Sequence, residues 1–183
     1  GVMLSLGQLH RSPRQLLIDA NRILSRHLDS RSFITITYAV VDLQDRTLTY
    51  ARAGHCPLLY LPGPYAPVRR VEVLAPDGLV LGLQIDDDGL MFTRLLEEAT
   101  LRLGPGDLFV LYTDGITEAM NPQGDCFGEQ RLSEIVQEHA TRPFEELRER
   151  ILREVAAFVG PSPQQDDMTM LLLKVEETPA VAG

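Results

Sequence analysis

Acidic side chains stand at the ends of two apolar runs, where they could hold a metal ion. The run "LFVLYT" is followed by Asp114 and Gly115, and Asp166 and Asp167 come directly before "MTMLLLKV". Carboxylate oxygens are hard ligands that suit Mg²⁺ or Mn²⁺ better than Zn²⁺. A glycine next to such a carboxylate lets the backbone come close to the ion. These residue types therefore indicate a site for a divalent cation that acts on phosphoryl oxygens.

The pairing of the two apolar runs decides whether these residues meet. If the runs form neighbouring antiparallel strands, the end of the first lies beside the start of the second, and Asp114 and Asp166 converge on one edge of a sheet. Two nearby carboxylates repel each other unless a cation lies between them. An Asp-Gly pair after a strand is also an ordinary turn. The spacing alone leaves both the metal site and the simple turn open.

The hydrophobic patterning predicts an α+β fold with antiparallel strands and helices in separate blocks. One helix ends near residue 9, and a second begins at Ser12, with Pro13 at its first position and Gln15 in a capping box. Residues 33–55 contain two β-rich runs around a polar turn, which predicts a hairpin. Further strands are expected within residues 56–63, 69–75, 78–83, 90–98 and 99–115, two helices within 128–140 and 142–159, and a last strand within 168–176.

The composition indicates a globular protein and argues against several classes of partner. The chain has 183 residues, of which 44% are hydrophobic, and a formal net charge of −9. This charge argues against a nucleic-acid-binding surface. No apolar run is long enough to span a membrane, and the first residues lack the features of a signal peptide. Cys56 and Cys126 are far apart and outside any Cys-x-x-Cys pair, so we expect free thiols and a cytoplasmic location.

Four segments, in order along the chain, resemble bacterial phosphatases of the PP2C type. They are "TLTYARAGHCPLLYL", "GLVLGL", "GDLFVLYTDGITEAMNPQGDCFGEQRL" and "QQDDMTMLLLKV". The subgroup they resemble is the one named for the sporulation phosphatase SpoIIE and the stress-response phosphatase RsbU. The resemblance implies an α-β-β-α sandwich with antiparallel sheets and a centre of two Mn²⁺ or Mg²⁺ ions at one edge of the paired sheets.

The resemblance also assigns expected roles to single residues. Asp114 matches the aspartate of the family's Thr-Asp-Gly motif, and Asp166 matches the first residue of its Asp-Asp/Asn-Met-Thr motif, which makes both expected metal ligands. Asp167 is given a supporting role at most. Gly115 is a weaker candidate beside the ions, and Glu118 is a weak candidate ligand of a looser third ion.

The function implied is hydrolysis of phosphoserine or phosphothreonine on a regulatory protein, without a covalent phosphoenzyme. The implied substrate is a phosphorylated STAS-type anti-sigma-factor antagonist, in a stress or developmental pathway, and relatives commonly carry a sensor domain upstream. The alternative is a non-catalytic module that keeps the phosphatase fold in order to bind partners.

One part of the family pattern has no counterpart here. Relatives begin with strands that end in an Asp-Xaa-Ser-Gly stretch, whose aspartate bridges both metals. Asp19, Asp29 and Asp77 do not match it. We therefore expect residues 1–176 to be the C-terminal major part of the domain, lacking its N-terminal strands, and 177–183 to be a flexible tail. Such a chain is expected to bind metal poorly and to expose strand edges, which a homodimer or a swapped assembly could cover.

The remaining signals favour structural roles. His55 is expected to be structural, because no nucleophile accompanies it. His10, His27 and His139 are expected at surface or boundary positions of helices. The acidic stretch 85–89 lacks the first and last ligands of a calcium loop, so we interpret it as a surface turn.

Overall fold

The computed structural model describes residues 1–29, 31–83 and 90–176. The chain divides into two compact units, each with its own sheet. Unit 1 comprises Gly1–His55 and Ala75–Leu103, and unit 2 comprises Cys56–Leu74 and Gly104–Gly183.

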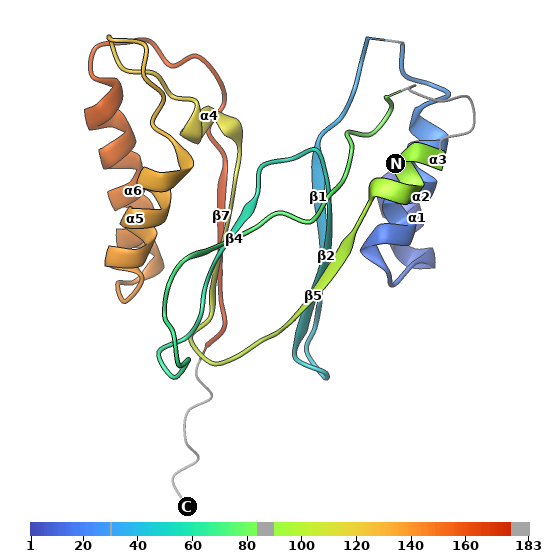
Figure 1. Cartoon of the computed structure of the whole chain (residues 1–183), viewed down its shortest axis with the longest axis horizontal. Coiled ribbons are helices and arrows are strands. Elements are labelled where there is room, and N and C mark those ends of the chain that lie inside the picture. The colour runs from blue at the N-terminus through green and yellow to red at the C-terminus, as the bar shows by residue number, and fades with distance from the viewer. Residues whose placement is uncertain (30, 84–89, 177–183) are drawn as a thin grey trace, which may run out of the picture. The chain divides into compact units, whose positions relative to one another are not determined.

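Unit 1 packs helices on a three-stranded antiparallel sheet of strand order β1-β2-β5 (Figure 1). Its elements are α1 (Val2–Leu9), α2 (Pro13–Leu24), β1 (Ile36–Asp42), β2 (Thr47–Ala53), α3 (Leu90–Leu95) and β5 (Glu98–Arg102). Its core consists of fully or nearly buried side chains: Leu6, Leu16, Leu17, Ile18, Ala20, Ala51, Ala53, Leu81, Phe92 and Leu96.

Helix α2 begins as the sequence predicts. The Ser12 hydroxyl accepts a hydrogen bond from the backbone N–H of Gln15 at 3.1 Å, and Pro13 occupies the first turn. The other half of a capping box does not form, because the Gln15 side-chain amide donates to Asp19 instead, at 3.3 Å. The predicted start is confirmed with a single side-chain cap.

The predicted hairpin over residues 33–55 is confirmed by the β1–β2 pair. The Asp42 carboxylate closes its turn by accepting the backbone N–H groups of Gln44 and Asp45 at 2.8 and 2.9 Å. These hydrogen bonds, that from Asp45 first, hold the pKa of Asp42 below its ordinary value. Arg46 completes the turn with a positive φ of 51°.

Two strand predictions in unit 1 are wrong. Residues 90–95 form helix α3 instead of a strand, and Phe92 and Leu96, four residues apart, are both buried as a helix face requires. Within the expected strand 78–83, only Leu81 pairs, in an isolated bridge with Ile34. Gly82 then takes a φ of +85°, which turns the chain out of the extended conformation.

Unit 2 has a four-stranded antiparallel sheet of strand order β4-β3-β6-β7. Its elements are β3 (Leu58–Leu61), β4 (Glu72–Leu74), β6 (Leu108–Tyr112), α4 (Asp114–Thr117), α5 (Glu129–His139), α6 (Phe144–Val159) and β7 (Met170–Lys174). Helices α5 and α6 lie together beside one face of this sheet (Figure 1). The core between them contains Leu59, Leu61, Leu108, Val110, Tyr112, Leu132, Val136, Leu147, Ile151 and Val155.

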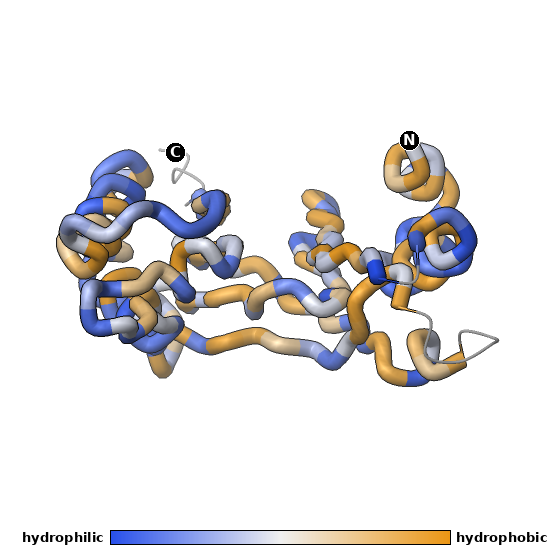
Figure 2. The backbone as a smooth tube through the Cα atoms, turned by 90° about the horizontal axis from the view of Figure 1, so that it is seen from above, coloured by the Kyte–Doolittle hydropathy of each residue, from blue (hydrophilic) through white to orange (hydrophobic). Residues whose placement is uncertain are grey.

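The apolar face of α6 is narrower than its sequence indicates. Leu147, Ile151 and Val155 are buried, whereas Phe144 and Leu152 are 36% and 42% exposed. In Figure 2, α5 and α6 carry both hydrophobic and hydrophilic residues, as expected for helices that cover a sheet. Helix α6 thus covers the sheet of unit 2 with one apolar face.

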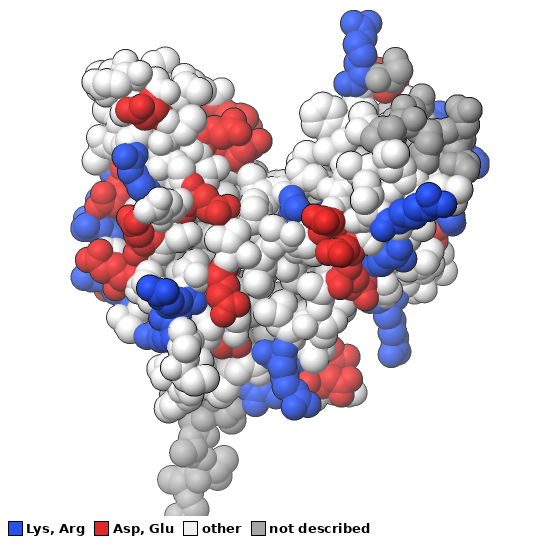
Figure 3. All heavy atoms as spheres, viewed as in Figure 1, with Lys and Arg blue, Asp and Glu red and all other residues white. Residues whose placement is uncertain are grey.

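Oppositely charged side chains four residues apart lie on α6 and just before its first residue. Arg142 and Glu146 approach to 3.2 Å, and Arg150 and Glu154 to 2.8 Å. Figure 3 shows acidic and basic side chains interspersed over this part of unit 2. Exposed pairs of this kind stabilise a helix by only ~0.3–0.5 kcal/mol each, so they serve mainly to keep this part of the surface solvated.

The α+β class with antiparallel sheets is thus confirmed, and the strands expected within residues 56–63, 69–75, 99–115 and 168–176 are present. Within the described part of the chain, no helix has both the length and the apolar character needed to cross a membrane.

Candidate active site

The ends of β6 and β7 bring the two acidic motifs together in unit 2. These strands are antiparallel, with Tyr112 opposite Met170 as the last pair of the ladder. The backbone N–H of Thr113 extends the pairing by donating to the carbonyl of Thr169 at 3.1 Å. Asp114 therefore follows β6 at the same edge of the sheet at which Asp166 precedes β7, as the antiparallel pairing predicts.

Thr113 ties the two strand ends together through its side chain. Its hydroxyl donates to the carbonyl oxygen of Asp167 at 3.0 Å and accepts the backbone N–H of Thr169 at 2.9 Å. Thr113, which directly precedes Asp114, thus holds the segment that follows Asp166 in place. Sequence reasoning did not single out Thr113, because a threonine at a strand end gives no signal of its own.

Gly115 is a glycine because another backbone segment lies against it. A Cβ at this position would collide with the carbonyl oxygen of Asp167 and lie 2.9 Å from its carbonyl carbon and 3.4 Å from that of Asp166. The φ of Gly115 is not in the left-handed region, so space alone demands the missing side chain. A glycine here was expected to let the backbone come close to an ion. In the structure, Gly115 instead makes room for the backbone of Asp166 and Asp167.

Asp114 and Asp166 are held alike by their own backbone. Each carboxylate accepts the N–H of the following residue, at 3.0 Å from Gly115 and 2.7 Å from Asp167. Both side chains are exposed, and among the described residues neither forms an ion pair with lysine or arginine. The Gln164 side-chain amide donates to the carbonyl of Asp166 at 2.8 Å, which further fixes this segment. The carboxylates remain open to a cation from solvent.

The pKa of the Cys56 thiol is affected by the carboxylates at this edge. Cys56 lies just before β3, the neighbour of β6, and burial is the first cause that raises the pKa of its thiol. The carboxylates of Asp114, Glu118 and Glu129 raise this pKa further, because they disfavour a nearby thiolate. The negative potential of these carboxylates, which adds to the effect of burial, also favours a cation at this edge.

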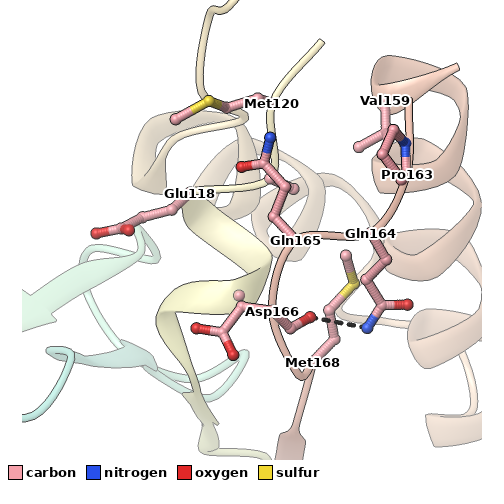
Figure 4. A pocket seen from close by; sticks show the side chains of 10 residues that line it. Glu118, Met120, Val159, Pro163, Gln164, Gln165, Asp166 and Met168 are labelled. Carbon is pink, nitrogen blue, oxygen red and sulfur yellow. Dashed lines mark hydrogen bonds between the residues drawn. The ribbon is translucent and has the colours of Figure 1, made fainter.

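Glu118 and Asp166 both contribute to a pocket beside the carboxylate edge (Figure 4). Glu118 follows the short helix α4, and its N–H donates to the carbonyl of Asp114 at 2.7 Å. The pocket has a volume of about 170 Å³. Its lining comes from two segments: Gly115, Glu118, Ala119 and Met120 from the first, and Val159, Pro163, Gln164, Gln165, Asp166 and Met168 from the second. Sequence reasoning named only Gly115, Glu118 and Asp166 among these.

These residues fit part of a metal-ion shell. Two exposed carboxylates at one edge, with backbone carbonyls beside them, supply the oxygen donors that Mg²⁺ and Mn²⁺ prefer. Among the described residues, however, there is no cluster of three or more histidine, cysteine, aspartate or glutamate side chains that could hold an ion. In the described part of the chain, Asp114 and Asp166 alone make up only part of such a shell.

The other sequence signals have structural explanations. The Nδ1 atom of His55 lies 3.2 Å from the Thr35 hydroxyl, which supports its expected structural role. His139, expected at a surface or boundary position, is only 7% exposed, because it lies three residues after buried Val136 on the inner stripe of α5. Cys126 is a free, exposed thiol. The acidic stretch 85–89 lies outside the described residues.

The fold of this chain resembles that of solved PP2C-type phosphatase domains. It matches the solved SiaA-PP2C domain of Pseudomonas aeruginosa with a TM-score of 0.74 at 24% identity, covering 91% of this chain and 61% of that one. It also matches the phosphatase domain of SpoIIE from Bacillus subtilis, in a structure described as Mn presoaked. That TM-score is 0.64 at 19% identity, covering 97% of this chain and 73% of that one.

The sequence comparisons then give the family. Residues 1–176 match the family model described as Stage II sporulation protein E (SpoIIE), and the chain belongs to this family. It is 31% identical over 162 residues to the phosphoserine phosphatase RsbU of Bacillus subtilis (strain 168). That alignment covers 88% of this chain and 45% of RsbU, so the chain spans about half the length of this relative.

Proposed function

We propose that the protein containing this chain is a metal-dependent protein serine/threonine phosphatase. The observation that carries the proposal is the convergence of Asp114 and Asp166 at one edge of the β6–β7 pair, where both carboxylates are exposed. The relationship to RsbU, which is named a phosphoserine phosphatase, supports the same activity.

In this proposal, Asp114 and Asp166 hold divalent ions, two in the intact centre, and Thr113 and Gly115 keep the two carboxylates in register. Asp167 supports Asp166, whose Oδ1 it hydrogen-bonds through its backbone N–H. Glu118 would contribute to a looser third ion. Bound Mn²⁺ or Mg²⁺ would supply a nucleophilic water at neutral pH and neutralise charge on the phosphoryl oxygens. No side chain then has to form a covalent phosphoenzyme, which agrees with the raised pKa of the Cys56 thiol.

The substrate we propose is a phosphorylated STAS-type anti-sigma-factor antagonist in a cytoplasmic stress or developmental pathway. The family relationship and the similarity to RsbU support this choice. A sensor domain upstream and a homodimer belong to the same proposal.

A non-catalytic interaction module is the rival function. One observation favours it: within the described residues, no group of three or more metal-ligating side chains is present. Such a module would bind the phosphoprotein without releasing phosphate.

A phosphate-release assay distinguishes the phosphatase from the interaction module. The full-length protein is incubated with Mn²⁺ and a phosphoserine protein, as wild type, as Asp166→Asn and as Asp45→Asn, a control at an exposed aspartate of unit 1. We expect Mn²⁺-dependent release that falls by ~100-fold or more in Asp166→Asn and is unchanged in Asp45→Asn. Binding of the phosphoprotein with no release in the wild type would favour the interaction module.

A further inference from the structure

We infer that the pocket beside Asp166 binds an apolar side chain of the phosphoprotein substrate, close in sequence to its phosphoserine. This inference rests on the proposed phosphatase function. It adds a specificity site to an edge that otherwise recognises only phosphate and metal.

The pocket combines polar and apolar side chains. Its polar lining residues are Glu118, Gln164, Gln165 and Asp166, and its larger apolar ones are Met120, Val159, Pro163 and Met168. Figure 4 shows Met120 on one side of the pocket and Val159 and Pro163 on the other, with Gln165 between them. Val159 and Met168 also pack against the core of unit 2, whereas Met120 is 36% exposed and presents an apolar side chain to the pocket.

The size of the pocket suits one side chain. An apolar cavity of ~150 Å³ accommodates a molecule the size of benzene, and this pocket measures about 170 Å³. A leucine, methionine or phenylalanine side chain therefore fits, and a folded element does not. The apolar part of the lining gives water few partners, so a substrate side chain displaces water from that part at little cost.

Continuity with the carboxylate edge identifies the occupant. Asp166 is both a proposed metal ligand and part of the pocket wall, so a phosphoserine at the metal edge brings its own flanking residues to the pocket mouth. An extended peptide advances ~3.3 Å per residue. The apolar residue that enters should therefore lie within about three positions of the phosphoserine.

A peptide panel tests the inference on the full-length protein with Mn²⁺. Each peptide carries one phosphoserine in a polar background, with leucine or glutamine at one of the three positions on either side. We expect one position at which leucine raises kcat/KM by ~10-fold over glutamine, the range that a hydrophobic pocket gives. Equal rates for leucine and glutamine at every position would overturn the inference.

A matched pair of variants assigns the preference to the pocket. Met120 is 36% exposed, and Met120→Gln keeps its length while making the wall polar. Leu152→Gln is the control, because Leu152 is a 42% exposed apolar residue of the same unit that does not line the pocket. The leucine-to-glutamine ratio should fall towards one in Met120→Gln and persist in Leu152→Gln, and an unchanged ratio in Met120→Gln would contradict the assignment. Absence of Mn²⁺-dependent release from every peptide and from the phosphoserine protein would instead contradict the proposed function.

Discussion

Gly115 shows how a single residue sets the geometry of the site. Replacing it with alanine would put a Cβ 2.9 Å from the carbonyl carbon of Asp167, in a backbone segment that Thr113 holds in place. Overpacking of this kind costs about 2 kcal/mol. We therefore expect Gly115→Ala to lower the free energy of unfolding by about 2 kcal/mol in urea titration.

Gly104→Ala is the matched control for this substitution. Its Cβ would meet only the Asp107 carboxylate, at an ordinary contact distance of 3.5 Å, so the loss should be well below that of Gly115→Ala. Equal losses for the two variants would mean that the close approach at Gly115 does not constrain the site.

Thr113 provides a second test at the residue scale. Thr113→Val removes the hydroxyl that bonds to Asp167 and Thr169, whereas Thr113→Ser keeps it. We expect Thr113→Val to lose ~1–2 kcal/mol of stability and to weaken Mn²⁺ binding, and Thr113→Ser to restore both. If the valine variant binds Mn²⁺ as tightly as the serine variant, Thr113 does not position the carboxylates.

The elements differ in how far their sequence determines them. Helices α2, α5 and α6 and the β1–β2 hairpin were predictable, because each has a cap, a turn or a periodic apolar face in its own sequence. Residues 90–95 were not, because a short apolar run fits a strand and a buried helix equally well. The single bridge at Leu81 depends on its partner Ile34, which is distant in sequence.

Strand β3 carries a pH-dependent contribution to stability. Burial, followed by the charge of Asp107 and a hydrogen bond with it, raises the pKa of Tyr60 to about 12. Between pH 10 and 12 the unfolded chain loses this phenolic proton while the folded chain keeps it, so stability falls as pH rises. Below pH 10 Tyr60 is protonated in both states, so it contributes no pH dependence to the stability.

Tyr60→Phe tests that assignment. Its free energy of unfolding, measured in urea from pH 9 to 11.5, should decline less steeply with pH than that of the wild type. The difference between the two slopes should be at most ~1.4 kcal/mol per pH unit, the contribution of one titrating group. If the free energies of unfolding of the two proteins decline in parallel, groups other than Tyr60 cause the loss of stability at alkaline pH. The ring stacking of Tyr60 on Phe109, with centroids 4.9 Å apart, should survive in the variant.

At the scale of the whole molecule, the sequence predicted where the site lies better than it predicted which other side chains surround it. The convergence of Asp114 and Asp166 followed from the antiparallel pairing of two apolar runs. The bonds of Thr113 and the apolar wall of the pocket did not, because they depend on side chains that only the folded unit 2 brings together. All of these residues belong to unit 2, so one sheet and its two covering helices position this entire group.

Metal binding tests the central claim most directly. Mn²⁺ is titrated into the full-length protein and followed by the electron paramagnetic resonance signal of the free ion, for the wild type, Asp114→Asn and the exposed control Asp45→Asn. We predict that Asp114→Asn weakens Mn²⁺ binding by ~10–100-fold or more, because loss of a residue that only hydrogen-bonds a metal ligand already costs this much, and that Asp45→Asn leaves it unchanged. Equal Mn²⁺ affinity in Asp114→Asn and the wild type would contradict the claim that β6 ends on Asp114 in order to hold a metal.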